Sequence, residues 1–403
     1  MSYIKRGTKS FRMANLALFA GGFNTFAILW STQPLLPEIA NEFHISPAVS
    51  SLTLSSTTIA LAISMLVVGS LSEVFGRKSV MTISLIASSI LAIITALSPN
   101  FHLLLLCRIL QGIVLAGLPA IAMAYLGEEI DPKSLGMAMG LYISGNSIGG
   151  MGGRIISGVL TDYFNWHIAL IGIGIISLMA SLLFWFTLPT SAHFQPRKFA
   201  VVKLGKSLIS QFNEPGLIYL FGTGFLLMGS FVSLYNYIGF QLIAPPYSLS
   251  QTIVGFIFIV YIVGTFSSTW MGMLADQHGR RKILQLSLLI LLIGACITLN
   301  TNLWLKIIGI AVFTFGFFAG HSIASGWVGK LSTHDKAQAS SLYLFFYYIG
   351  SSIGGTVGGM FYSDFGWIGV IVMIIVFTII AIGLSVRLGT IAKRKLQLSS
   401  QKL

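Results

Sequence analysis

Long apolar stretches, separated by short polar segments, are the feature that most constrains the fold of this chain. They recur from Met13 to Leu388, and each has about 18–26 residues. A helix of this length crosses the hydrocarbon core of a bilayer, which is about 30 Å thick. The pattern predicts twelve membrane-spanning helices, over residues 13–36, 48–71, 79–98, 101–126, 135–160, 167–188, 216–241, 250–274, 283–300, 303–328, 337–361 and 366–388.

Two other architectures fit the sequence poorly. A transmembrane β-barrel needs segments of about ten residues with alternating polarity, and the run IIGIAVF at 307–313 does not alternate. A soluble domain has about 25% charged residues, whereas this chain has 9% and leaves no long polar region for a separate domain. We therefore expect an all-α integral membrane protein, with its first span kept as a signal anchor.

The basic residues are distributed unequally between the two sides of the predicted membrane. With twelve spans, 21 of the 24 Lys and Arg residues fall on the side that holds both termini. Because Lys and Arg are enriched in cytoplasmic loops, both termini are predicted to be cytoplasmic, in a multi-pass protein of the cell membrane. Anionic lipid headgroups account for the net charge of +13, so no nucleic-acid partner is expected.

A repeated motif indicates that the chain consists of two related halves. GSLSEVFGRK at 69–78 has a near copy, GMLADQHGRR, at 272–281. We expect two pseudo-symmetric six-helix bundles, residues 1–189 and 216–403, joined by a basic linker at 190–215 that lies along the inner headgroup layer. Glycines spaced four residues apart also recur in both halves, on one helix face where they permit close helix packing: Gly145, Gly149 and Gly153, and then Gly350, Gly354 and Gly358.

The repeated loop resembles the pattern Gly-x-Leu-x-Asp-x-x-Gly-Arg-Lys/Arg of the major facilitator superfamily, with Glu73 where that family usually has Asp. The glycine before the arginine allows a tight turn, and the acid is expected to pair with a basic residue on a neighbouring helix. Such pairs would hold the two halves together on the inner side while they rock about a central site. The predicted conformational motif consists of Gly69, Glu73, Gly76, Arg77, Lys78, Gly272, Asp276, Gly279, Arg280 and Arg281.

Two further segments extend the resemblance. CRILQGIVLAGLPA, with Arg108, Gln111 and Gly112, looks like the second motif of that superfamily. GNSIGG resembles the motif of its twelve-helix drug:proton antiporter branch, although Asn146 stands where proline is usual. The resemblance implies export of drugs or other small organic compounds by alternating access, in exchange for protons. Transport of one organic anion or sugar-like metabolite, by symport or uniport, is the alternative.

Two arginines lie inside predicted spans, where a charge costs about 2.5–3.5 kcal/mol at a helix centre. The positions that match Arg154 and Arg108 in the second half carry no charge, which favours a function over packing; the alternative is that each arginine binds a helix-end carbonyl or an acid. Arginine stays protonated, so proton coupling needs another group. The predicted set is Arg108, Arg154, Glu38, Glu128, Asp162 and His321.

Aromatic and amide side chains inside the spans are candidates for a substrate cavity, because they bind both apolar and polar parts of an organic molecule. Interhelical packing is the alternative for each of them, and Cys107 and Cys296 are both expected in the core. Glu128, Glu129 and Asp131 form the only acidic cluster of the sequence, with no histidine nearby, and no nucleotide motif occurs, so we expect no enzyme, cofactor or metal. We also expect a monomer. The predicted cavity residues are Asn24, Trp30, Gln33, Tyr142, Asn146, Tyr235, Asn236, Tyr237, Tyr261, Trp327 and Tyr347.

Overall fold

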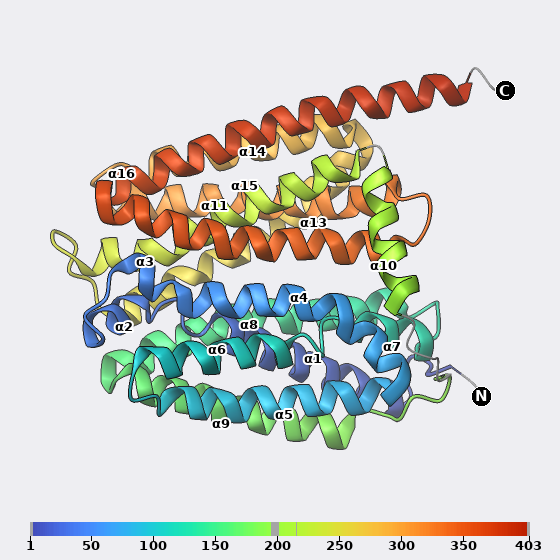
Figure 1. The fold of residues 1–403 in the computed structure, drawn as a ribbon, viewed down its shortest axis with the longest axis horizontal. Helices are drawn as coiled ribbons and strands as arrows, with labels where there is room; N and C mark the ends of the chain where they lie inside the picture. Colours follow the sequence, from blue (N-terminus) through green and yellow to red (C-terminus); the bar gives the residue numbers. More distant parts are fainter. Residues whose placement is uncertain (1–2, 195–200, 215, 401–403) are drawn as a thin grey trace. The chain divides into compact units, whose positions relative to one another are not determined.

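The fold is all-helical (Figure 1). The computed structural model describes residues 3–194, 201–214 and 216–400, without the side chains of 201–203 and 389–400, so Arg197 and Lys198 of the predicted linker lie outside the described residues. The helices are α1 (Lys9–Trp30), α2 (Leu36–Glu42), α3 (Pro47–Ser50), α4 (Leu52–Phe75), α5 (Arg77–Ala96), α6 (Phe101–Leu115), α7 (Ala122–Glu129), α8 (Leu135–Tyr163), α9 (Trp166–Thr187), α10 (Val201–Ser210), η1 (Gln211–Asn213), α11 (Leu217–Ile243), α12 (Gln251–Phe256), η2 (Ile257–Val260), α13 (Tyr261–His278), α14 (Arg280–Ile297), α15 (Leu303–Leu331) and α16 (Lys336–Ser400).

The predicted membrane spans fall on these helices. Within the described ranges, eight helices are long and apolar enough to cross a membrane by themselves, and α6 is a shorter apolar helix. The last two predicted spans are joined in α16, where the backbone leaves the helical region at Gly366 with φ 61° and ψ −149°. The chain has the predicted architecture of two six-helix bundles.

Two of the interruptions in the predicted spans lie at prolines. The first span was predicted to continue to residue 36, but α1 ends at Trp30 and a new short helix, α2, begins at Leu36 with a proline in its first turn. The fourth span is divided into α6 and α7, and Pro119 lies in the turns between them. Proline lacks the backbone N–H that a helix interior requires and its ring clashes with the preceding turn, so it disfavours a continuous helix at both places.

The chain divides into two compact units, whose borders differ from the predicted ones. Unit 1 comprises residues 1–199 and 242–258, and unit 2 comprises residues 200–241 and 259–403. The segment 242–258, which includes α12, packs with unit 1 through α8 because Gly158 and Gly255 meet backbone to backbone. The predicted linker at 190–215 is shared between the two units, since its helix α10 belongs to unit 2.

Each unit contains the same close pair of helices. A Cβ at Gly149 of α8 would lie 2.3 Å from the carbonyl oxygen of Phe23 in α1, and a Cβ at Gly354 of α16 would lie 2.4 Å from Cα of Gly229 in α11. The other glycines of the two trios face the same partner helices at equally short distances. These contacts require glycine, because any side chain would force the helix backbones apart.

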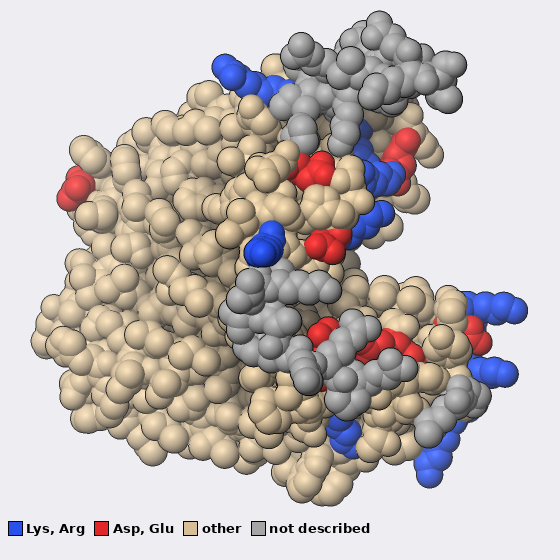
Figure 2. Space-filling model, turned by 45° about the vertical axis from the view of Figure 1, so that its right-hand side comes forward, with Lys and Arg blue, Asp and Glu red and all other residues tan. Residues whose placement is uncertain are grey.

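Most of the surface seen in Figure 2 is uncharged. Such a surface is expected of a chain that crosses a bilayer many times. Many large apolar side chains are exposed along the helices, including Ile83, Phe186 and Trp304. Cys107 is buried as predicted, but Cys296 is exposed on α14, so its prediction as a core residue is wrong.

Candidate functional site

The two motif loops form the same turn. Gly76 links α4 and α5 with φ 92° and ψ 139°, and Gly279 links α13 and α14 with φ 95° and ψ 127°. These backbone dihedral angles belong to a region that residues other than glycine rarely adopt. The repeated sequence thus produces one local geometry in both units.

In unit 1 the motif arginine binds an acid that the motif does not contain. The buried guanidinium of Arg77 donates to both oxygens of Glu128 on α7, at 3.2 and 2.7 Å, and to the hydroxyl of Ser72 at 2.6 Å. Glu73 is 3.8 Å from the same guanidinium. The structure thus places Glu128 in an ion pair of the turn, and its part in proton coupling stays a prediction.

In unit 2 the motif acid has two basic partners. Asp276 accepts from Arg280 at 2.7 Å and from Lys330 of α15 at 3.2 Å. Lys330 is the basic residue on a neighbouring helix that the sequence led us to expect, although the pair lies inside one unit. That such pairs hold the two halves together stays a prediction.

Arg108 connects helices of unit 1 from a position that is almost completely buried. Its guanidinium, 1% exposed, donates to the carbonyl oxygens of Leu29 at 3.1 Å, of Thr53 at 2.9 Å and of Ile28 at 3.4 Å. It also donates to Gln111 at 2.6 Å. Ile28 and Leu29 lie in the last turn of α1, where carbonyls lack helical partners and attract a cation. These contacts match the helix-end alternative for Arg108.

Arg154 lies in a second buried cluster of unit 1, which we call the Arg154 cluster: Arg154, Trp30, Gln33 and Phe258. The guanidinium donates to Gln33 Oε1 and to the carbonyl oxygen of Gly150, both at 2.7 Å. Its Cζ lies 4.6 Å from the ring centroid of Trp30 and 4.8 Å from that of Phe258. Cation–π attraction and these hydrogen bonds offset part of the cost of burying the charge. Arg108 and Arg154 thus contact neighbouring residues at the end of α1.

The remaining predicted carboxylates lie towards the same end of unit 1. Glu38 on α2 is half-buried and accepts from Gln251 of α12 at 3.1 Å. Asp162 is exposed at the end of α8, where polar groups of Thr252 and then of Ser250 lower the pKa of its carboxyl below the ordinary value. Asp162 therefore remains ionised at neutral pH and is poorly suited to pick up a proton.

Unit 2 contains an aromatic cluster that brings together four predicted residues. Tyr235 of α11 lies 5.3 Å from Tyr261 of α13 between ring centroids, and His321 of α15 lies 4.5 Å from Tyr347 of α16. Two phenylalanines link these pairs: Phe231, 4.7 Å from Tyr235, and Phe317, 3.8 Å from Phe231 and 6.1 Å from His321. We call this set the unit 2 aromatic cluster: Phe231, Tyr235, Tyr261, Phe317, His321, Tyr343 and Tyr347.

Polar atoms occur at both ends of the unit 2 aromatic cluster. The hydroxyl of Tyr235 and that of Thr314 are 2.6 Å apart, and Nδ1 of His321 lies 3.0 Å from the hydroxyl of Tyr343. Tyr235 and Tyr343 are buried, while His321 and Tyr347 are half-buried and keep part of their surface accessible. The cluster therefore contains aromatic faces, hydroxyls and one imidazole. Its residues come from four helices, α11, α13, α15 and α16.

Other predicted cavity residues pack between helices. Asn24 is completely buried and donates to Ser177 O at 2.7 Å, Ser181 Oγ at 2.6 Å and Ser89 Oγ at 3.1 Å, which connects α1 with α5 and α9. Tyr237 donates to the carbonyl oxygen of Gly355 in α16. These contacts match the packing alternative for Asn24 and Tyr237, and a part in substrate binding stays a prediction for both. Four others lie elsewhere. Tyr142 lies in an apolar core with Phe11 and Leu18, and Asn146 lies against Gly22. Asn236 and Trp327 are buried on α11 and α15.

Sequence reasoning missed Tyr343, Phe231 and Phe317. Tyr343 precedes Tyr347 by four residues, and Phe317 precedes His321 by four, so each lies on the same helix face as a predicted residue. That spacing is the signal that points to them.

Two repeated bundles of membrane-spanning helices, each with polar or charged side chains buried inside it, define a polytopic membrane transporter. The sequence model described as the Major Facilitator Superfamily matches residues 18–246 and 221–402, and the chain belongs to that superfamily. It is 57% identical to the uncharacterized MFS-type transporter YybF of Bacillus subtilis (strain 168), over 96% of this chain and 95% of that one. It is 46% identical to the inner membrane transport protein YnfM of Escherichia coli (strain K12), over 96% and 93% of the two chains.

A solved structure has the same fold. The bacterial homolog of the human lysosomal transporter Spinster, in an inward-facing and unoccupied conformation, aligns with a TM-score of 0.79 at 16% identity, over 96% of this chain and 98% of that one. The relatives and the fold are those of transporters, not of enzymes.

Proposed function

We propose that this transporter exports small organic compounds that combine an apolar part with a polar or cationic group, in exchange for protons and by alternating access. The observation that carries the proposal is the unit 2 aromatic cluster, because aromatic faces beside hydroxyls suit an amphipathic molecule better than a sugar. The half-buried rings of His321 and Tyr347 give a compound a surface to bind. The predicted orientation, with both termini in the cytoplasm, belongs to the same proposal.

His321 is the proposed proton carrier. An imidazole gains and loses a proton far more readily than a guanidinium, so His321 suits this role better than the two buried arginines. When protonated, His321 is attracted by the faces of Tyr347 and Phe317, whose centroids lie 4.5 and 6.1 Å from its own. A cationic compound on the same faces repels that proton. Since such coupling is reciprocal, binding of the compound releases the proton and protonation releases the compound.

The test is transport by the purified protein in vesicles that contain a pH-sensitive dye. Addition of a carried compound should move protons, and His321→Gln should abolish the proton movement while the compound still binds. His102→Gln is the matched control, because His102 is exposed at the start of α6, outside the cluster. Unchanged proton movement in His321→Gln would refute the role of His321, and no proton movement with any compound would refute antiport.

Transport of an organic anion is the second candidate, and the Arg154 cluster favours it. A guanidinium held between two aromatic rings presents both a positive charge and apolar faces, which suits an aromatic carboxylate. Arg154→Gln should then abolish carriage of anions in the vesicle assay, whereas under the first proposal it should leave carriage of cationic compounds measurable.

A further inference from the structure

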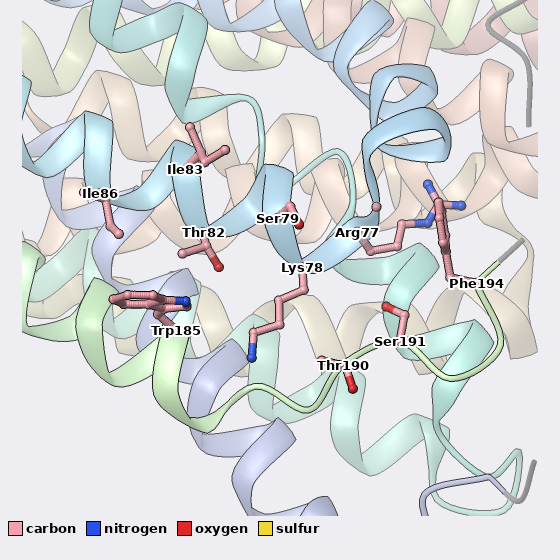
Figure 3. A pocket seen from close by; sticks show the side chains of 11 residues that line it. Arg77, Lys78, Ser79, Thr82, Ile83, Ile86, Trp185, Thr190, Ser191 and Phe194 are labelled. Carbon is pink, nitrogen blue, oxygen red and sulfur yellow. The ribbon is translucent and has the colours of Figure 1, made fainter. Parts of the chain in front are cut away.

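A pocket of about 510 Å³ opens in unit 1 beside the first motif turn, between the start of α5 and the chain that follows α9 (Figure 3). The transport proposal does not use it. Its walls are the turn at Gly76 to Ser79, the next two turns of α5, Trp185 near the end of α9, and residues 190, 191 and 194. One end of the pocket is polar and the other is apolar.

The polar end is suited to an anion. Lys78 extends into it (Figure 3), and its ammonium, which has three N–H donors, gives one to the carbonyl oxygen of Leu188 at 2.5 Å. Ser191 Oγ is buried and has no hydrogen-bond partner among the described residues. Helix α5 begins here with Gly76 as N-cap, and it has neither a side-chain cap nor an acid in its first turn. The backbone N–H groups of that turn therefore favour a nearby negative charge as well.

The apolar end faces outward from unit 1. Ile83 is 68% exposed and Trp185 is 48% exposed, on neighbouring helices that otherwise present apolar side chains to the surroundings. Ile86 continues this lining one turn further along α5. Tryptophan is enriched at the boundary between headgroups and hydrocarbon, and the basic turn lies on the side predicted to be cytoplasmic. An occupant that fits both ends is an amphiphile with an anionic group.

The second copy of the motif has the turn but not this wall. Lys78 corresponds to Arg281, which follows the equivalent Gly279. In unit 1 the chain after α9 returns as an irregular segment over 188–194, whereas after the last span of unit 2 the backbone continues as helix α16 to Ser400. The pocket is therefore a property of the first turn and of residues 188–194 together, not of the motif alone.

We propose that this pocket binds the phosphate group of an anionic glycerophospholipid of the cytoplasmic leaflet, with an acyl chain along Ile83, Ile86 and Trp185. The net charge of +13 favours anionic lipids at this surface in general, but the pocket adds a fixed place for one of them.

The test is native mass spectrometry of the full chain in detergent, titrated with phosphatidylglycerol and, separately, with phosphatidylcholine. The wild type should retain one phosphatidylglycerol in preference to phosphatidylcholine. Removal of the charge in Lys78→Gln should lower this retention about fivefold, which corresponds to the loss of one basic contact with an anionic lipid. Lys78→Arg, which keeps the charge, should restore it, and equal melting temperatures of the variants exclude a folding defect.

Lys133→Gln is the matched control, because Lys133 is an exposed base of unit 1 outside the pocket. Equal losses in Lys78→Gln and Lys133→Gln would show that only the general surface charge binds lipid and would overturn the proposal. So would equal retention of the two lipids. Glycerol phosphate distinguishes a free phosphate from a lipid: displacement of the lipid by this headgroup alone, at matched concentration, would contradict the part assigned to Ile83 and Trp185.

Discussion

Replacement of the turn glycines by alanine tests whether the repeated motif acts through backbone geometry. An alanine Cβ has room at both turns, since the nearest atom would be Ser79 Oγ at 3.9 Å for Gly76, and no atom lies within 4 Å for Gly279. Any cost is therefore conformational, from φ values of 92° and 95°. Such backbone strain costs about 1–3 kcal/mol per residue.

Each of Gly76→Ala and Gly279→Ala should lower the apparent melting temperature of the purified protein by roughly 2–12 °C, at about 2–4 °C per kcal/mol for a unit of this size. The double variant should show the sum, because the two turns lie in different units and share no partner. Scanning fluorimetry in detergent measures all three.

Matched controls are Gly140→Ala in α8 and Gly329→Ala in α15, one in each unit. Both glycines are helical, and a Cβ would meet no atom within 4 Å. Alanine is favoured over glycine by about 0.5–1 kcal/mol inside a helix, so these variants should be as stable as the wild type or more stable. If the melting temperatures of the turn variants equal or exceed those of these controls, the geometric account of the motif is refuted.

Three other substitutions follow from the contacts. Gly354→Ala should destabilise unit 2 by about 1–3 kcal/mol, since the new Cβ would lie 2.4 Å from Cα of Gly229 and overpack the α11–α16 interface; thermal melting that matches Gly329→Ala would contradict this. Glu128→Gln should cost about 1.5–3 kcal/mol in the same assay, because it removes the charged partner of the buried Arg77, and Lys133→Gln should not. Asn24→Leu should cost about 1–3 kcal/mol, because it removes the buried amide that donates to the carbonyl oxygen of Ser177 and to the hydroxyls of Ser89 and Ser181. Unchanged transport by a variant that still folds would agree with a packing role for Asn24.

The features that sequence predicted well are those that depend on neighbouring residues in the chain. A glycine between two helices with an arginine directly after it predicts the turn at Gly76, and four-residue spacing predicts the faces of Gly149 and Gly354. The apolar stretch predicts a first helix that continues to residue 36, whereas α1 ends at Trp30. Pro34, which lacks a backbone N–H, is the residue in the sequence that indicates the earlier end.

Tertiary partners were beyond the reach of the sequence. Tyr235 and Tyr237 are two residues apart and therefore point to different sides of α11, but the pattern does not say which side meets α15 and which meets α16. Arg77 likewise had several acids within reach of its predicted loop, and only the approach of α7 selects Glu128. The same holds for Arg108, whose partners are carbonyl oxygens that every residue carries.

Alternating access is the central claim of the proposed function, and the distance between the two units during transport tests it most directly. Spin labels can be placed at Lys133→Cys and Lys282→Cys, which are exposed residues of unit 1 and unit 2, after Cys107 and Cys296 are replaced by serine. Pulsed electron–electron double resonance should reveal two populations of label-to-label distance. Their ratio should change when the pH is lowered from about 8 to about 6 or when a carried compound is added. A single distance that neither pH nor a carried compound alters would contradict the account.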